Sequence, residues 1–174
     1  GFSEADEHEK AKAMALAEES DVIVAVVGGS SSRFGGAVFD ANGAASKGTG
    51  SRSMDCGEGM DTAKVHIPAA QEELIAALAR LGKPLVTVVI AGRAYCIEKI
   101  ENASDAVLYA FYPGPMGGRA VAELLYGSSN PSGRLPVSMP RHVGQIPVCY
   151  NYRTSVAPAY CDMTVSYTHL TLPT

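Results

Sequence analysis

The apolar positions of the chain gather in three short runs. They occupy residues 21–27, 84–90 and 105–111 and are rich in valine, isoleucine, leucine and alanine. Polar residues do not alternate regularly with apolar ones in these runs, which is typical of strands buried on both faces of a sheet. We therefore predict three buried strands. A weaker apolar segment at 135–138 predicts a short additional strand.

The segments around these runs have helical spacing. Four helices are predicted, at 4–20, at 68–81, at about 95–102 and after 118 with a stop at Gly127. Pro68 suits a first helical turn and Gly82 a helix end. The positions expected to face the core are Ala13, Met14, Leu16, Ala17, Leu74, Ile75, Leu78, Leu81, Val121, Leu124 and Leu125.

Helix and buried strand alternate along the chain, which predicts an α/β fold with a mainly parallel sheet flanked by helices. Ligands of such sheets meet the loops at the carboxyl ends of the strands. Four segments follow predicted strands or lie between them: 28–33, the Gly-, Ala- and Ser-rich stretch 34–64, 92–93, and 112–118. We expect the functional site at the edge where these loops converge.

The stretch 54–61, with the sequence MDCGEGMD, holds three carboxylates within eight residues. Gly57 and Gly59 flank the middle one, Glu58, so little side-chain bulk surrounds it and the backbone is free to take unusual conformations. A carboxyl presented in this way can reach into a cleft. The competing interpretation is a solvated acidic loop without a chemical role.

Composition narrows the functional classes. The chain has 174 residues, 47% of them hydrophobic, and a formal net charge of −4. The sequence has no basic run or stripe of the kind that binds nucleic acid, and no apolar run is long enough to cross a bilayer. The four cysteines show no metal or disulfide spacing and favour a reducing compartment such as the cytoplasm. We expect the chain, which does not start with Met, to begin within a longer protein.

Further candidate residues follow the first strand. Ser30, Ser31 and Arg33 could hydrogen-bond the hydroxyls of a ligand, or they could form a turn that leads into the next segment. Asp61 is a further candidate for substrate binding, although it and Asp55 fit a structural role or a place at the rim of a site better than catalysis. Gly28 and Gly29 do not complete a GxGxxG motif, so no dinucleotide cofactor is expected. No His spacing suggests a metal, and no GxSxG elbow suggests a serine hydrolase.

Several motifs in fixed order resemble family 3 glycoside hydrolases over roughly residues 8–153. They are Asp21–Gly28, the GEGMD loop 57–61, Pro68-Ala69-Ala70-Gln71 with Leu74-Ile75, Gly82-Lys83-Pro84, Gly92-Arg93, Tyr112-Pro113-Gly114 with Gly117-Gly118, Leu125–Gly127, Asn130–Pro136, Gly144–Pro147 and Tyr150–Tyr152. The matched region is similar to the second domain of a β-glucosidase or β-xylosidase, a three-layer α/β sandwich. We therefore expect a domain at 1–153 and, at 154–174, a truncated tail with extraneous sequence at its end.

The resemblance implies a division of labour between two domains. In the family, a (β/α)8 barrel supplies an Asp nucleophile, and the second domain commonly supplies a general acid/base Glu on a loop. Glu58 matches that position, with Thr62 where the family often has Arg. The barrel is absent from this sequence, so the chain is expected to be inactive alone on its β-glucoside or β-xyloside substrate. The alternative is a non-catalytic α/β domain that binds a sugar or docks to another domain.

Overall fold

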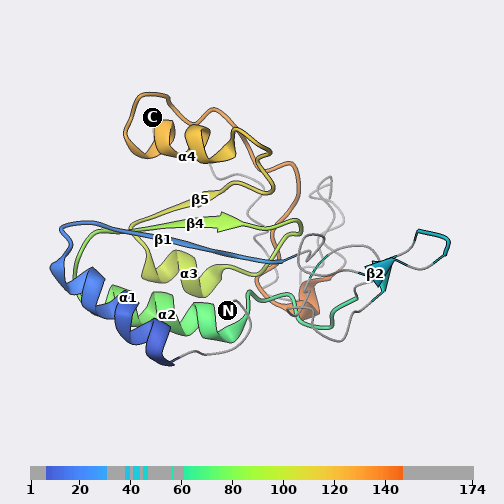
Figure 1. Cartoon of the computed structure of the whole chain (residues 1–174), viewed down its shortest axis with the longest axis horizontal. Helices are drawn as coiled ribbons and strands as arrows, with labels where there is room; N and C mark the ends of the chain where they lie inside the picture. The colour runs from blue at the N-terminus through green and yellow to red at the C-terminus, as the bar shows by residue number, and fades with distance from the viewer. Residues whose placement is uncertain are drawn as a thin grey trace, which may run out of the picture.

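The core of the computed structural model is a parallel sheet of three strands. The structure describes residues 7–30, 38–39, 41–43, 45–46, 56 and 61–146. The sheet has the order β1-β4-β5, with β1 at Ile23–Gly28, β4 at Leu85–Ile90 and β5 at Ala106–Tyr109 (Figure 1). Ile23 pairs with Leu85, and Val86 pairs with Ala106. The three strands predicted from the apolar runs are confirmed.

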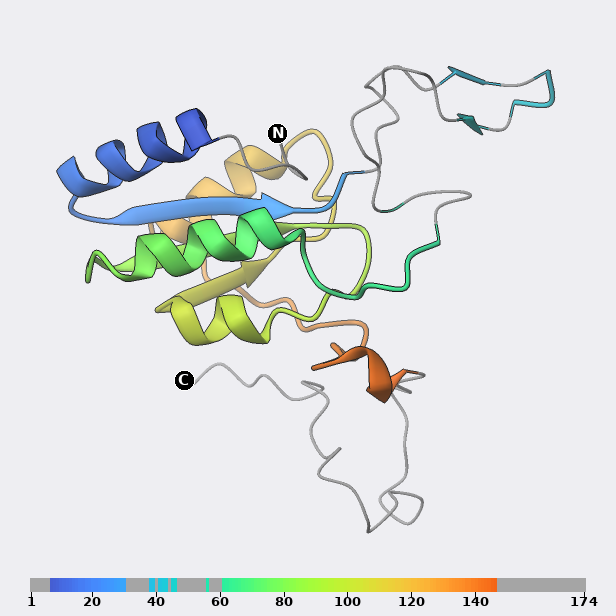
Figure 2. The ribbon, with the colours of Figure 1, turned by 90° about the horizontal axis from the view of Figure 1, so that it is seen from below.

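Helices cover both faces of this sheet. Helices α1 (Glu7–Glu19), α2 (Ala69–Ala79) and α3 (Glu98–Ala103) lie on one face, and α4 (Gly117–Leu125) lies on the other (Figures 1 and 2). The predicted three-layer α/β sandwich is therefore confirmed. A 3₁₀ turn, η1, follows at Val143–Gln145. None of the helices in the described part of the chain has the length and apolar character needed to cross a membrane.

The main core lies between the sheet and the layer formed by α1, α2 and α3. Helix α2 is central to it and packs against α1, α3 and β1. Apolar side chains from α2, α3 and the strands bury almost all of their surface there, among them Ile75, Leu85, Val89 and Ile100. The one fully buried threonine of β4, Thr87, shares a hydrogen bond of 2.7 Å with the hydroxyl of Ser104, so its polar atom is satisfied.

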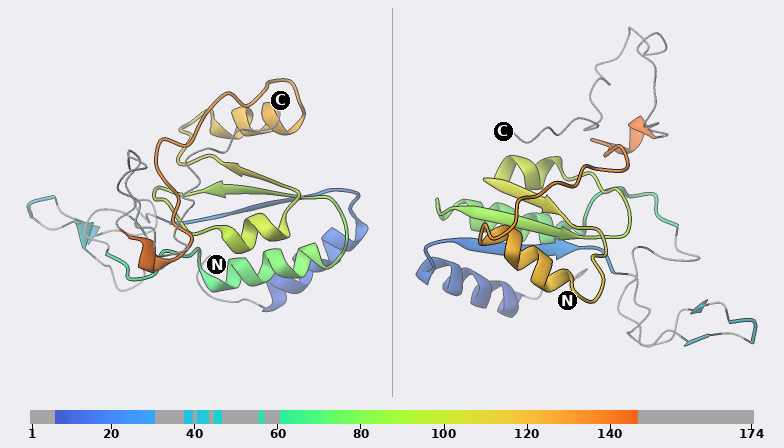
Figure 3. Two further views of the ribbon diagram at one scale, coloured as in Figure 1. Left: turned by 180° about the vertical axis from the view of Figure 1, so that it is seen from behind. Right: turned by 90° about the horizontal axis from the view of Figure 1, so that it is seen from above.

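Strand β1 differs from the prediction that it is buried on both faces. Its side chains alternate, with Ile23 and Ala25 in the core, whereas Val24 is 47% and Val26 60% exposed. β1 is an edge strand, and α4 lies on the second face without burying these two valines (Figure 3, left). An uninterrupted apolar run can therefore form a strand with one exposed face.

Three further predictions about individual positions are wrong. In α1, Leu16 is largely exposed, and Ala17 provides the buried contact. In α4, Leu125 is exposed at the helix end. Residues 135–138 form no strand; Pro136 has no N–H to contribute to a sheet.

Two segments are more structured, or structured differently, than expected. Within the long stretch 34–64, β2 (Val38–Phe39) and β3 (Ala45–Ser46) form a short antiparallel ribbon beyond the carboxyl ends of the main strands (Figure 3, right). Helix α3 begins at Glu98, not near 95. Cys96 instead forms a β-bridge with His66, and its N–H donates to the carbonyl of Val65 at 2.6 Å.

Candidate functional site

The end of β1 is built around Gly28. This residue has a φ of +149°, a conformation that side chains with a Cβ rarely adopt. A Cβ added here would lie 1.8 Å from the carbonyl oxygen of Ile90, the residue that pairs with Gly28 on β4. The two strands therefore approach each other at this position only because residue 28 is glycine.

Gln71 of α2 satisfies the backbone of the same glycine. Its Oε1 accepts a hydrogen bond from the Gly28 N–H at 2.7 Å, and its Nε2 donates to the Gly28 carbonyl at 2.9 Å. Gln71 is buried, so these bonds replace solvent that cannot reach the strand end. The first turn of α2 is thereby fixed to the carboxyl edge of the sheet.

Cys56 is held at the same edge by two contacts. Its backbone N–H donates to the carbonyl of Ser30 at 3.4 Å. Its Sγ lies 2.8 Å from the hydroxyl of Tyr112, and either group can be the donor. The Cys56 side chain is buried, with the residue only 4% exposed. Residue 56 of the MDCGEGMD stretch thus lies against the loops that follow β1 and β5.

Tyr112 itself is placed by the backbone around it. Phe111, directly before it, has a φ of +52°, which is strained for a residue other than glycine. The Phe111 carbonyl accepts a hydrogen bond of 3.2 Å from the N–H of Ala91. The ring of Tyr112 then lies over Gly92, where an added Cβ would be 2.5 Å from the ring. The absence of a side chain at residue 92 gives the ring its place.

A second tyrosine, Tyr109, forms hydrogen bonds with the backbone of the loop after β4. The Tyr109 hydroxyl donates to the carbonyl of Arg93, and it accepts a hydrogen bond of 3.4 Å from the N–H of Tyr95. Burial raises the pKa of Tyr109 to about 12, because the ionised form would lose solvation. Its ring contacts that of Phe111 at a centroid distance of 4.8 Å. Tyr109 therefore stays neutral and structural at ordinary pH.

Charged groups join α2 and α3 below this edge. The buried Glu72 carboxylate lies 2.7 Å from Lys99 Nζ and 3.4 Å from His66 Nδ1. The hydrogen bond to Glu72 raises the pKa of Lys99. Nearby, burial raises the pKa of the Cys96 thiol, which donates to the carbonyl of Arg141. Each of these groups has an internal partner, so the cluster is structural.

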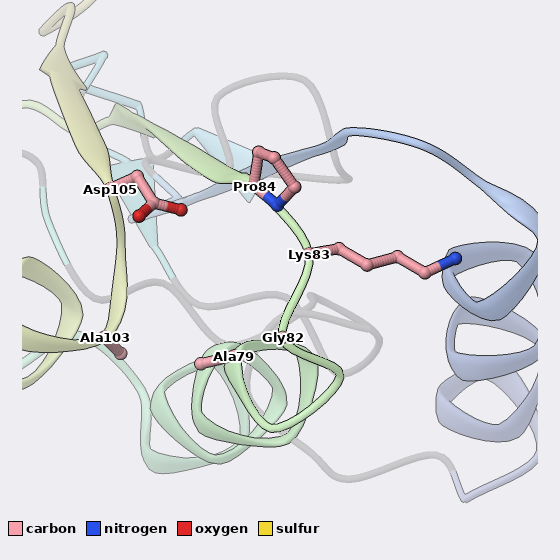
Figure 4. A pocket seen from close by; sticks show the side chains of 6 residues that line it. All are labelled: Ala79, Gly82, Lys83, Pro84, Ala103 and Asp105. Carbon is pink, nitrogen blue, oxygen red and sulfur yellow. The ribbon is translucent and has the colours of Figure 1, made fainter.

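A pocket lies at the opposite end of the sheet, beside the amino ends of β4 and β5 (Figure 4). Its volume is about 380 Å³, and its polar lining comes from Lys83 and Asp105. Lys83 donates to the carbonyls of Glu18 and Ser20, and Asp105 accepts from the N–H of Leu85. Both side chains hold neighbouring elements together, and the pocket is remote from the carboxyl edge.

The residues predicted for the site are only partly described. Glu58, Ser31 and Arg33 lie outside the described residues, as does Asp55. Ser30 is at the carboxyl edge, where its carbonyl contacts Cys56. Asp61 is exposed, and no hydrogen bond between described residues joins it to this group. No cluster of three or more potential metal-ligating side chains occurs among the described residues.

The sequence analysis placed the segments that hold Cys56 and Tyr112 at this edge, but it singled out neither side chain and did not place Gln71 there. Gln71 could have been found. It shares the buried face of α2 with Ile75 and Leu78, and a polar side chain on a buried face needs a partner. No sequence pattern predicts the contact between Cys56 and Tyr112, because these residues belong to different loops and are 56 positions apart.

Comparison with known proteins shows the family. The family described as the glycosyl hydrolase family 3 C-terminal domain matches residues 3–169. A periplasmic beta-glucosidase of Salmonella typhimurium is 38% identical over 157 residues, which are 90% of this chain and 18% of that protein. A beta-xylosidase of Formosa agariphila is 42% identical over 101 residues, 58% of this chain and 14% of that protein.

Solved structures of beta-glucosidases resemble the fold of this chain. The beta-glucosidase of Listeria innocua in complex with glucose superposes with a TM-score of 0.70 at 29% identity, over 99% of this chain and 21% of that one. A beta-glucosidase of Erythrobacter marinus gives a TM-score of 0.70 at 35% identity, over 91% of this chain and 20% of that one. The chain thus spans less than a quarter of the length of these relatives. It belongs to the C-terminal domain family of the family 3 glycosyl hydrolases.

Proposed function

We propose that this chain is the second domain of a retaining β-glycosidase that hydrolyses β-glucosides or β-xylosides. Glu58 is its general acid/base, and the Asp nucleophile comes from a (β/α)8 barrel domain of the same protein. The observation that carries the proposal is the family match over residues 3–169, together with relatives named beta-glucosidase and beta-xylosidase. The substrate is a β-linked oligosaccharide or glycoside.

The chemistry requires two carboxyl groups about 5–5.5 Å apart. One attacks the anomeric carbon and forms a covalent glycosyl-enzyme. The other protonates the leaving oxygen and then removes a proton from the water that hydrolyses the intermediate. A single carboxyl cannot do both, so catalysis needs the barrel's Asp as well as Glu58.

The contacts of Cys56 support this role for Glu58. Cys56 is tied to Ser30 and Tyr112 at the carboxyl edge, where ligands of parallel sheets bind. Glu58 follows Cys56 by two residues, and two residues of chain span at most about 7 Å. An anchored Cys56 therefore limits how far the Glu58 backbone can lie from this edge.

Four polar residues complete the proposed sugar site. Ser30, Ser31 and Arg33 follow β1 directly, and their hydroxyl and guanidinium groups suit hydrogen bonds to sugar hydroxyls. Asp61 is exposed at the far end of the MDCGEGMD stretch and could accept such bonds. These side chains bind substrate and transfer no proton in the proposed mechanism.

The test is the variant Glu58→Ala in the full-length enzyme. Loss of a general acid/base costs about 10²–10⁴-fold in rate. A disaccharide, whose leaving group needs protonation, should be affected most. An aryl glycoside with an acidic phenol needs little help in the first step, so the glycosyl-enzyme should accumulate. Added azide should then attack the intermediate, restore turnover and yield a β-glycosyl azide.

Two aspartates of the same stretch are the matched controls. Asp55→Ala and Asp61→Ala should weaken binding at most, with neither leaving-group dependence nor azide rescue. The isolated chain should hydrolyse no aryl β-glucoside or β-xyloside above contaminant level. If Glu58→Ala slows both substrates equally and gives no azide product, Glu58 is not the acid/base; activity of the isolated chain would contradict the two-domain mechanism.

A further inference from the structure

The contact between Tyr112 and Cys56 joins two loops at the carboxyl edge. The Tyr112 hydroxyl and Cys56 Sγ are 2.8 Å apart. Cys56 is buried at 4% exposure, whereas Tyr112 is about half exposed. A thiol forms only weak hydrogen bonds, so it holds a loop effectively only where its partner is already fixed in place.

Tyr112 is fixed in this way. The strained backbone of Phe111 turns the chain at the end of β5, and the Phe111 carbonyl is bonded to Ala91. The ring rests on Gly92, where there is no room for a Cβ. Two features that cost conformational freedom, a positive φ at Phe111 and a glycine at residue 92, therefore serve the placement of one tyrosine ring.

We propose that Tyr112 is a positioning residue for the acid/base. Its hydroxyl holds Cys56, and Cys56 precedes Glu58 by only two residues in the sequence. This inference rests on the proposed function of Glu58. Misplacement of a catalytic group by about 1 Å can cost on the order of 100-fold in rate. Loss of the Tyr112 hydroxyl should therefore impair proton donation without removing the acid.

The first measurement concerns the contact alone and does not depend on activity. In the full-length enzyme, the alkylation rate of Cys56 by iodoacetamide is followed by mass spectrometry of its peptide. Tyr112→Phe removes only the hydroxyl and should speed alkylation of Cys56 several-fold. Gly92→Ala displaces the ring and should do the same. The control Tyr126→Phe alters a tyrosine that is 87% exposed and should leave the rate unchanged.

The second measurement concerns catalysis. Tyr112→Phe should lower kcat/KM for a disaccharide about 10- to 100-fold, less than the loss of the general acid itself. For an aryl glycoside with an acidic phenol, the same variant should lose less than about threefold, since that leaving group needs little protonation. A purely structural role would slow both substrates alike. Melting temperatures close to that of the wild type show that the variants are folded.

A double-mutant cycle connects the two residues. Cys56→Ser keeps a group that can bond to Tyr112 and should retain more disaccharide activity than Cys56→Ala. In the Tyr112→Phe background, serine and alanine at residue 56 should behave alike. If they still differ, Cys56 acts through another partner and the proposal fails.

The outcomes separate this inference from the proposed function. Unchanged alkylation of Cys56 in Tyr112→Phe would show that the hydroxyl does not hold the loop. Faster alkylation with equal loss on both substrates, while Glu58→Ala keeps its leaving-group dependence, would overturn the positioning role alone. If Glu58→Ala shows no such dependence, the acid/base assignment fails, and the contact is structural.

Discussion

Gln71 and Gly28, which are 43 residues apart in the sequence, form a closed pair of hydrogen bonds. The Gln71 carboxamide accepts from the N–H of Gly28 and donates to its carbonyl. A side chain of α2 thus satisfies the backbone groups at the end of β1. The pair lies between the core and the loops that carry the proposed sugar site. Its loss should therefore affect stability before it affects chemistry.

We predict that Gln71→Leu destabilises the protein by about 2–4 kcal/mol, because it leaves two buried backbone groups without partners. Gln71→Glu should be at least as damaging, since a carboxylate cannot donate to the Gly28 carbonyl. Urea denaturation measures the change. Glu73→Leu, on the exposed side of the same helix, is the control and should change stability by less than about 0.5 kcal/mol. A near-neutral Gln71→Leu would contradict this account.

Gly28→Ala should be more severe than either change at Gln71. The new Cβ would overlap the Ile90 carbonyl and require a φ that alanine rarely adopts, so a loss above about 3 kcal/mol is expected. Gly118→Ala is the matched control. That position lies within α4 and has open space around it, so alanine should stabilise the helix by about 0.5–1 kcal/mol. Thermal unfolding of both variants distinguishes a steric requirement from a general effect of alanine.

The raised pKa of Tyr109 predicts a loss of stability in alkali. In the unfolded chain the phenol titrates near pH 10, whereas burial raises its pKa to about 12 in the folded state. The neutral phenol therefore contributes fully below pH 10, and this contribution is lost as the pH rises to 12; because the ring is only partly buried and solvent screens part of the effect, we expect a loss of about 1 kcal/mol. Urea midpoints between pH 9 and 11 should fall less steeply in Tyr109→Phe than in the wild type. Tyr126→Phe should keep the wild-type slope.

The exposed valines of β1 predict the surface behaviour of the isolated chain. Val24 and Val26 lie bare on an edge strand, so we expect marginal stability and binding of an apolar dye. Val24→Thr and Val26→Thr together should reduce dye binding and leave the melting temperature nearly unchanged. The same change at Val89, which is buried, should lower it. A sharp, high melting transition of the wild type without dye binding would contradict the expectation.

Most of the fold could be predicted from the sequence, because the strands that form it are apolar along their whole length. What the pattern could not supply was the geometry between elements. Leu16 and Ala17 are both apolar and adjacent, and only the angle at which α1 packs decides that Ala17 is buried and Leu16 is exposed. Likewise, Tyr95 and Ile97 have helical spacing with the residues that follow, but Cys96 between them is bonded to the backbone of Val65 and pairs with His66, so α3 begins only at Glu98.

The convergence of the loops at one edge of the sheet was predictable from the sequence, but the contacts that hold these loops were not. Parallel strands place their following loops at one edge, and Ser30 lies there together with Cys56. The roles of Glu58, Ser31 and Arg33 stay predictions, because these residues lie outside the described part of the chain. The contact of Tyr112 with Cys56 depends on a glycine and a strained phenylalanine elsewhere in the sequence, and no local rule links those positions.

The pairing of β1 with β4 has a consequence for how the chain folds. Ile23 pairs with Leu85, and residues 24–84 lie between them in the sequence, so this contact of the sheet is far from local. Closing such a segment slows folding, because the chain loses conformational entropy before the strand pairing can stabilise the structure. The equilibrium cost depends only weakly on length, at about 0.6 kcal/mol for each doubling. Loops within this segment can therefore change length at little entropic cost to stability, whereas α2, which the segment also contains, must keep its contacts with the core.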